Sequence, residues 1–255
     1  MRQNPAHKTD GALKERLLFS NAACVVINKL AGESSESMFP AGDKFQTGTF
    51  PEGKFPTPVH RLDMPVSGCL LLARNPSAAA FLGGAFAGRR VDKRYWAIIE
   101  KPQSEDALPS SGELVHWLKE NRKANKSFAY EVGDAYEVGD AHAAIESPPS
   151  QGRHSRLKKA ILRYRLAGKG EHYLFMEIEL VTGRRHQIRS QLAAIGLHIK
   201  GDLKYGARRS EKAGGIRLHA YSLAFPNPLN PDETITVKAL PPVMDSLWTA
   251  FNGCL

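Results

Sequence analysis

The stretch HRLDMPVSGCLLLARNP, residues 60–76, carries the strongest local signals of structure in this chain. Its residues 66–73 form a short apolar run, which predicts a buried strand. Asn75 and Pro76 predict that a helix follows and runs to about Gly88, because Asn caps helices well and Pro is tolerated at the first helical position. The stretch therefore predicts a buried strand followed directly by a helix.

Asp63 stands between this strand and a long segment rich in Gly, Ser and Pro, residues 31–58. A carboxylate at the end of a core strand is held rigidly and can still face a cleft, which suits a nucleophile or a general base. An Asx turn, or a surface ion pair with Arg61, explains the same residues without catalysis. The tetrapeptide by itself leaves both interpretations open.

Outside this stretch, the hydrophobic pattern predicts further strands at residues 24–27, 93–100, 158–166, 172–181, 218–225 and 235–237. It predicts helices at residues 185–195 and 245–251. Strands and helices without strict alternation indicate an α+β fold.

The middle of the chain, residues 101–157, is harder to interpret. It contains the hexapeptide YEVGDA twice in tandem, at residues 130–135 and 136–141. Two short copies are too few for a solenoid. We therefore predict a surface loop or hairpin expansion with little order.

The composition narrows the classes of function. A net charge of +9 and a pI near 9.5 indicate a polyanionic partner, most simply nucleic acid. No apolar run approaches the roughly 20 residues that cross a bilayer, and no secretory signal opens the chain, so we expect a cytoplasmic protein. The three cysteines form no CxxC and the nine histidines show no ligand spacing, so we predict neither a metal site nor a disulfide framework.

A basic segment, TGRRHQIR at residues 182–189, is predicted to form a turn and the first turn of a helix. It carries Arg184, Arg185, His186 and Arg189, with Arg185 and Arg189 on one helix face. Helix N-termini offer N–H donors and a positive dipole, so the segment predicts an anionic ligand or a buried carboxylate partner. A solvated basic face is the alternative.

Three other features have a structural as well as a functional interpretation. Tyr95, in KRYWA at residues 93–97, could stack on a base if it faces a cleft, but core packing explains it too. His219 is more simply a structural histidine. GDLKYG at residues 201–206 predicts a tight turn rather than a catalytic group.

Taken together, these segments resemble the RluA-type family of pseudouridine synthases. The resemblance rests on HRLD followed by SGCLLLA, then KRYWA, LVTGRRHQIR, AAIGLHIKGDLKYGA and LHAYSLAFPNP, in the family's order over about residues 17–240. It implies a flexible tail at residues 1–16 and a single catalytic domain at residues 17–255. The implied fold is α+β, with a mixed, mostly antiparallel bent sheet, flanking helices and an active-site cleft.

The resemblance also implies roles for individual residues. Asp63 looks like the nucleophile, Arg189 like the cation paired with it, and Tyr95 like the aromatic that stacks on the target base. Arg61 looks like the residue that fills the space left by a flipped nucleotide. The further RNA contacts that we expect are His60, Arg184, Arg185 and His186, and the expected apolar supports are Leu62 and Ile188.

Some positions depart from the family pattern. Leu30 stands where Pro usually follows Asn-Lys, Met64 where a basic residue usually follows HRLD, and Gln191 and Asn227 each replace a common His. The small RNA-binding domain that precedes many relatives is expected to be absent. Target choice is then expected to depend on the catalytic domain and its loops, including residues 101–157.

The implied activity is isomerisation of uridine in structured RNA, with ribosomal RNA expected first and transfer RNA second. We expect a monomer that needs no cofactor and no metal. A non-catalytic RNA-binding or ribosome-assembly protein on the same scaffold is the main alternative. A hydrolase of nucleosides or sugars is a third class, but it usually needs a second positioned carboxylate, and the sequence shows no convincing partner for Asp63.

Overall fold

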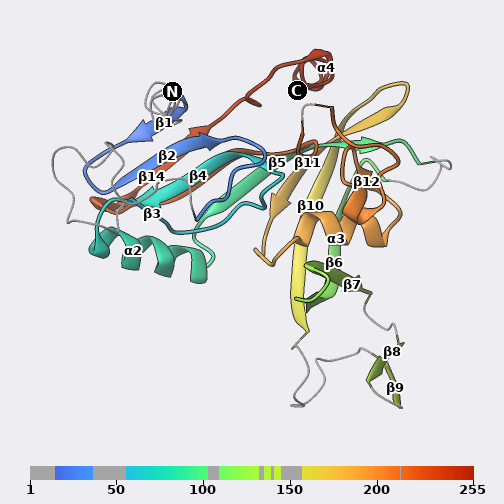
Figure 1. Ribbon diagram of the computed structural model, residues 1–255. Helices are drawn as coiled ribbons and strands as arrows, with labels where there is room; N and C mark the ends of the chain where they lie inside the picture. Colours follow the sequence, from blue (N-terminus) through green and yellow to red (C-terminus); the bar gives the residue numbers. More distant parts are fainter. Residues whose placement is uncertain are drawn as a thin grey trace, which may run out of the picture. The chain divides into compact units, whose positions relative to one another are not determined.

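The computed structural model describes residues 15–36, 56–102, 109–131, 135–138, 141–144, 157–212 and 214–255, with only the backbone described at 135–138 and 141–144. The chain divides into two compact units (Figure 1). Unit 1 is Met1–Arg94 with His219–Thr249, and unit 2 is Tyr95–Leu218 with Ala250–Leu255. Many strands with few helices confirm the α+β class. The boundaries given above for a single catalytic domain stay a prediction.

Unit 1 is built on a mixed set of strands in the order β1-β2-β4-β13, with β14 beside β13 and β3 beside β4. The neighbours are antiparallel, except that β4 and β13 run parallel. The bounds are β1 Leu17–Ser20, β2 Cys24–Lys29, β3 Thr57–Pro58, β4 Ser67–Ala73, β13 Leu218–Asn227 and β14 Asn230–Lys238. Every residue of β4 is buried, as its apolar run predicted.

Helix α2 (Pro76–Ala87) follows β4 as predicted. The Asn75 side chain caps it by accepting the Ala78 N–H at 2.8 Å, and Pro76 occupies its first position. Ala78, Leu82 and Ala85 of the helix pack into the core of unit 1 with residues of β2, β4, β13 and β14. No helix among the described residues is both long enough and apolar enough to span a membrane.

Gly68 sets the approach of β4 to β13. Its φ is +121°, and a Cβ at this position would lie 2.3 Å from the Ala220 carbonyl oxygen. Only glycine tolerates both the backbone conformation and this contact. The Ser-Gly that follows HRLD is therefore explained by packing between neighbouring strands.

Unit 2 has the strand order β5-β11-β10-β6-β7, with β12 beside β5. The strands are β5 Asp92–Glu100, β6 Ser111–Asn121, β7 Lys126–Tyr130, β10 Lys158–Lys169, β11 Tyr173–Leu180 and β12 His198–Ile199. Its helices are α3 Gln187–Ala194 and the 3-10 turn η3 Leu203–Tyr205, while the closing helix α4 Ser246–Asn252 begins in unit 1 and ends in unit 2. Phe251 packs against Trp96 and Phe175, with ring centroids 4.8 and 5.4 Å apart.

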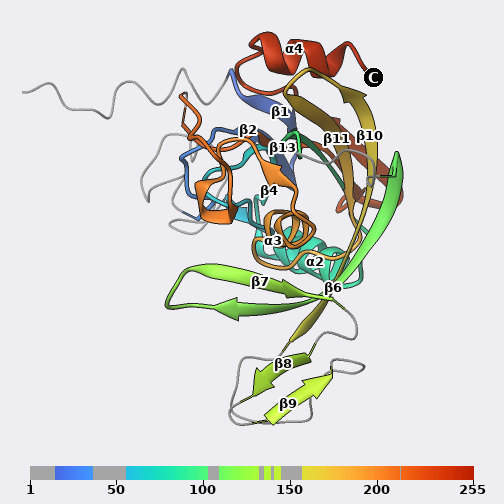
Figure 2. The ribbon, with the colours of Figure 1, turned by 90° about the vertical axis from the view of Figure 1, so that its right-hand side faces the viewer.

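The prediction for residues 101–157 was wrong where it expected little order. Strand β6 pairs with β10 from Ser111 to Leu118 and continues into a hairpin with β7 (Figure 2). The tandem hexapeptide contributes to a second, separate pair, β8 (Ala135–Val138) and β9 (Ala141–Ala144). Local patterning missed β6 because its main partner, β10, lies far along the chain, and that pairing makes it a strand.

Candidate active site

The segment that carries Asp63 lies between β3 and β4 in unit 1. The Val66 N–H donates to the Asp63 carbonyl at 2.9 Å, which turns the chain into β4. Leu62 is buried, Asp63 is half-buried and Arg61 is exposed. The carboxylate is therefore attached to a fixed strand end and keeps access to solvent.

The backbone on both sides of Asp63 is held by the turn that follows β2. The buried Ser35 hydroxyl donates to the Leu62 carbonyl (3.0 Å) and accepts the Leu62 N–H (3.1 Å). The Gly32 N–H donates to the Met64 carbonyl at 2.7 Å. Because both chain neighbours of Asp63 are hydrogen-bonded, its Cα has little freedom. Sequence reasoning missed Ser35, since one serine in a Gly- and Ser-rich loop carries no signal.

Lys29, the last residue of β2, is fully buried beneath the same turn. Its ammonium donates to the carbonyls of Leu30 (2.8 Å), Glu33 (2.8 Å) and Met64 (3.3 Å). Burial lowers the pKa of Lys29 to about 8, while the negative charges of Glu33 and Asp63 act in the opposite direction. A cation thus lies under the Asp63 segment and interacts with it electrostatically, a feature that the sequence did not predict.

Arg61 and His60, both predicted RNA contacts, differ in their surroundings. Arg61 is paired with Glu36 at 3.0 Å on the surface, where both side chains are more than half exposed. The His60 Nε2 accepts the Leu71 N–H at 3.0 Å, and its ring stacks on Phe86. Burial, with a smaller effect of Lys93, lowers the pKa of His60 to about 3, so the ring is neutral at pH 7. His60 supports β4, whereas Arg61 is free to exchange its partner.

Tyr95 lies on β5 in unit 2 and is 7% exposed. Both faces of this strand are buried from Tyr95 to Ile99, so alternation does not distinguish a cleft face from a core face. The stacking role of Tyr95 stays a prediction. Leu62 and Ile188, the expected apolar supports, are both buried.

The basic segment at residues 182–189 forms a turn closed by Gln187. The Gln187 Oε1 accepts the Thr182 hydroxyl (2.8 Å) and the Arg184 N–H (2.9 Å). Helix α3 begins only at Gln187, after His186 with a left-handed φ of +52°. The predicted i, i+4 pair of Arg185 and Arg189 was therefore wrong, because Arg185 precedes the helix.

Arg189 makes a bidentate ion pair with Asp202. Its Nε and one terminal nitrogen each lie 2.7 Å from a different Asp202 oxygen, and the two side chains are 5% and 1% exposed. The guanidinium also lies 4.8 Å from the centroid of the Tyr205 ring. The sequence predicted an anionic ligand or a buried carboxylate partner, and separately a turn at residues 201–206, but it did not connect the two. Asp63 and Arg189 belong to different units, and the predicted pairing between them stays a prediction.

The other basic residues of this segment do not form one exposed cluster. His186 is buried, with its Nδ1 2.9 Å from the Tyr205 hydroxyl. Arg185 pairs with Glu120 and also contacts Asn125, while the exposed Arg184 donates to the Lys159 carbonyl. Of the basic side chains at residues 182–189, those of Arg184 and Arg185 reach the surface. Among the side chains described, no group of three or more His, Cys, Asp or Glu residues is arranged to hold a metal ion.

Comparison with known proteins assigns a class to this arrangement. Residues 23–194 match the family described as RNA pseudouridylate synthase. A protein of Zymomonas mobilis named as an uncharacterized RNA pseudouridine synthase is 31% identical over 83% of this chain and 87% of its own length. The tRNA pseudouridine synthase C of Haemophilus ducreyi is 30% identical over 91% of this chain and 92% of its own.

The fold agrees with this class. The solved structure of human RNA pseudouridylate synthase domain containing 4 matches with a TM-score of 0.70 at 22% identity, covering 96% of this chain and 94% of that one. This chain belongs to the RNA pseudouridylate synthase family, whose members are isomerases. The family predicted from the sequence is confirmed.

Proposed function

We propose that Asp63 is the nucleophile with which this enzyme converts uridine to pseudouridine in structured RNA. One observation carries the proposal: Asp63 is a half-buried carboxylate whose two chain neighbours are held by Ser35 and Gly32. A nucleophile must be both rigid and reachable. The structure provides rigidity through the backbone and leaves the side chain accessible.

The proposed reaction is balanced without an external reagent. The bond between C1′ and N1 breaks, a bond between C1′ and C5 forms, C5 loses a proton and N1 gains one. We therefore expect no requirement for a cofactor or a metal. Asp63 acts as a covalent nucleophile or as a base during cleavage of the glycosidic bond.

The target uridine must leave its stack, at a cost of about a few kcal/mol. We assign to the exposed Arg61 the space that the nucleotide vacates, and to Tyr95 the stacking on the base. Arg189 keeps the proposed role of the cation that stabilises the charged Asp63. Arg184 and Arg185 remain proposed RNA contacts, since both reach the surface.

His60 and His186 are proposed to act through other residues, because each makes hydrogen bonds inside the protein. His60 would support the Asp63 segment from β4, and His186 would hold Tyr205 beside Arg189. Both contribute to the shape of the site rather than contacting phosphate directly.

The proposed substrate is transfer RNA or ribosomal RNA, modified in the cytoplasm by a monomeric enzyme. The match to the tRNA pseudouridine synthase C of Haemophilus ducreyi extends over 91% of this chain and 92% of that protein. The match to the ribosomal large subunit pseudouridine synthase D of Zymomonas mobilis, at 28% identity, extends over 87% of this chain and 64% of that protein. Transfer RNA is therefore the first substrate to test, whereas the sequence alone placed ribosomal RNA first.

The test is to map pseudouridine in total RNA from cells with and without the gene, by chemical labelling that stops reverse transcription. We expect one or a few sites to disappear and to return with the wild-type gene but not with Asp63→Asn. The mutant protein should still bind RNA. Unchanged maps, together with RNA binding by the wild type, would support the non-catalytic alternative instead.

A further inference from the structure

The β6–β7 hairpin of unit 2 has an inner and an outer face. Residues directly opposite each other in its register share a face, and faces alternate along each strand. Leu118 and Ser127, at inner positions, are 4% and 2% exposed. On the outer face Lys119 lies opposite Phe128, and Phe128 is 39% exposed. The Lys126 ammonium lies 5.4 Å from the centroid of the Phe128 ring, so the outer face presents an aromatic ring together with positive charge.

The turn of the hairpin, residues 121–126, is well defined. The Asn121 side chain accepts the Ala124 N–H at 3.0 Å, and Asn125 adopts a left-handed φ of +49°, which Asn tolerates better than most residues. This turn carries Arg122 and Lys123, both exposed. The cations at the tip are therefore held on an ordered turn.

The hairpin is anchored to the segment that precedes α3 and to η3. The Ser127 N–H donates to the Tyr205 hydroxyl (2.8 Å), and the Ser127 hydroxyl donates to the Arg185 carbonyl (2.8 Å). The Lys204 ammonium donates to the Asn125 carbonyl at 2.9 Å. Figure 2 shows the hairpin beside α3, in agreement with the contacts between α3 and both β6 and β7. A ligand on the hairpin would thus be bound by a fixed part of unit 2.

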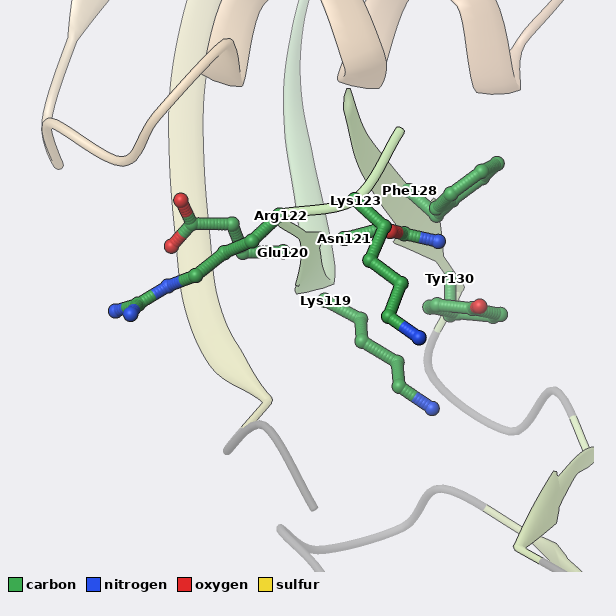
Figure 3. Close-up of a pocket in the computed structure, with 7 residues that line it drawn as sticks. All are labelled: Lys119, Glu120, Asn121, Arg122, Lys123, Phe128 and Tyr130. Carbon is green, nitrogen blue, oxygen red and sulfur yellow. The ribbon is translucent and has the colours of Figure 1, made fainter. Parts of the chain in front are cut away.

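A shallow pocket of 420 Å³ lies on this hairpin, and its volume is within the range of small-ligand sites, so it has room for a nucleotide. Its lining is Lys119, Glu120, Asn121, Arg122, Lys123, Phe128 and Tyr130. In Figure 3 the Lys119 and Lys123 side chains extend toward the same side as Tyr130, while Glu120 and Arg122 point away from them. Glu120 is paired with Arg185, so the pocket keeps a positive surplus.

We propose that this outer face, formed by Lys119, Lys123, Phe128 and Tyr130, binds a single-stranded part of the substrate RNA. The lysines would contact phosphates and the rings would stack on an unpaired base, the combination that serves single-stranded RNA. The inference rests on the proposed function, because it names where the RNA of that reaction is held. Positive charge with aromatic rings favours RNA over a protein partner, for which charged residues are usually depleted at the centre of an interface.

The test measures binding of a fluorescent 16-nucleotide single-stranded RNA of mixed sequence, and of a 16-base-pair RNA duplex, over a series of KCl concentrations. Lys119→Gln with Lys123→Gln should weaken single-strand binding about tenfold and reduce the slope of log affinity against log salt by about 1.4, or 0.7 for each phosphate contact. The matched control is Lys169→Gln with Lys212→Gln, which removes the same charge from exposed positions of the same unit. The control should change neither quantity by more than about one third as much.

Phe128→Ala should weaken binding of the single strand by about tenfold and bind the duplex nearly as well as the wild type, because paired bases are not available for stacking. Phe128→Tyr should bind like the wild type because it keeps an aromatic ring, and the retained duplex binding of Phe128→Ala shows that this variant is folded. With total RNA from the deletion strain, the losses should appear mainly as a higher KM for pseudouridine formation.

Equal affinity and salt slope in the hairpin variants and the wild type would overturn the inference and leave the face to a protein partner or to none. Equal losses in the control pair would overturn it too, because net charge alone would then explain them. If the wild type forms no pseudouridine while the hairpin variants lose RNA binding, the proposed function fails and the RNA-binding face stands.

Discussion

The segment around Asp63 and the segment around Arg189 are fixed in opposite ways. Ser35 and Gly32 bind the main chain on either side of Asp63 and leave its side chain half-exposed. Arg189 is fixed by its side chain, in a buried bidentate pair with Asp202. A charged side chain can therefore be positioned in two ways. Hydrogen bonds to its main chain leave the charged group accessible, whereas an ion pair to the charged group compensates for its burial.

The comparison predicts how each segment fails. Removing a partner from the buried pair leaves a charge without compensation, so the loss should appear in stability. Removing a hydrogen bond that holds the main chain beside Asp63 should lower the activity as well as the stability.

Asp202→Ala should lower the free energy of unfolding by about 3–5 kcal/mol, because it leaves the Arg189 guanidinium buried without its carboxylate. Urea denaturation measures this. The double variant Arg189→Met with Asp202→Leu should lose less than Asp202→Ala, since it removes both charges. A double variant as unstable as the single one would show that packing, and not the unpaired charge, dominates.

Ser35→Ala should lower the free energy of unfolding by about 1–3 kcal/mol, because the buried Leu62 N–H and carbonyl lose their common partner. It should also lower kcat more than it raises KM, because the main chain beside Asp63 loses its hydrogen bonds to Ser35 while the RNA contacts remain. Ser35→Thr keeps a hydroxyl and should recover part of kcat. Normal kcat in Ser35→Ala would show that the hydrogen bonds between Ser35 and Leu62 do not position Asp63.

Lys29 should make stability depend on pH in the alkaline range. Its pKa is about 8 in the folded protein against 10.5 in the unfolded chain, so between these values the unfolded chain binds more protons. Stability from this group should therefore rise with pH, with a slope of at most about 1.4 kcal/mol per pH unit. Urea denaturation of the wild type and Lys29→Met at pH 7.5, 8.5 and 9.5 isolates the contribution of Lys29 to this pH dependence. A stability difference between the two proteins that stays constant with pH would contradict the prediction.

Arg61→Ala should change the free energy of unfolding by less than about 1 kcal/mol, since its ion pair with Glu36 is exposed. Its effect should appear in turnover of structured RNA, where the arginine is proposed to occupy the space of the flipped base. Glu36→Ala is the control, because it breaks the same ion pair but should leave turnover near that of the wild type. If both variants lost turnover equally, the ion pair between Arg61 and Glu36 would explain the loss, and not a contact of Arg61 with RNA.

Much of the fold could be predicted from local signals. The apolar run of β4 gave a buried strand, and Asn75 with Pro76 gave the start of α2. His219 was expected to be structural, and it bonds to the Ser67 hydroxyl (2.9 Å) and the Ala239 carbonyl (3.0 Å). These features depend on residues whose chemistry identifies them without a distant partner.

The missed features depend on partners far along the chain. Strand β6 is a strand because β10 pairs with it, and Asp202 is a partner because η3 brings it to α3. Ser35 and Lys29 hold the Asp63 segment across a long loop. None of these contacts has a signal in the spacing of the sequence.

The family, the α+β class and the candidate nucleophile Asp63 could be predicted from the sequence, because five motifs in a fixed order carry that information. The partners that compensate the buried charges of Lys29 and Arg189, and the exposed face of the β6–β7 hairpin, became known from the folded chain. The reason is physical: a buried charge or a strand edge is satisfied by whatever group folding brings to it, and that group can come from any part of the chain.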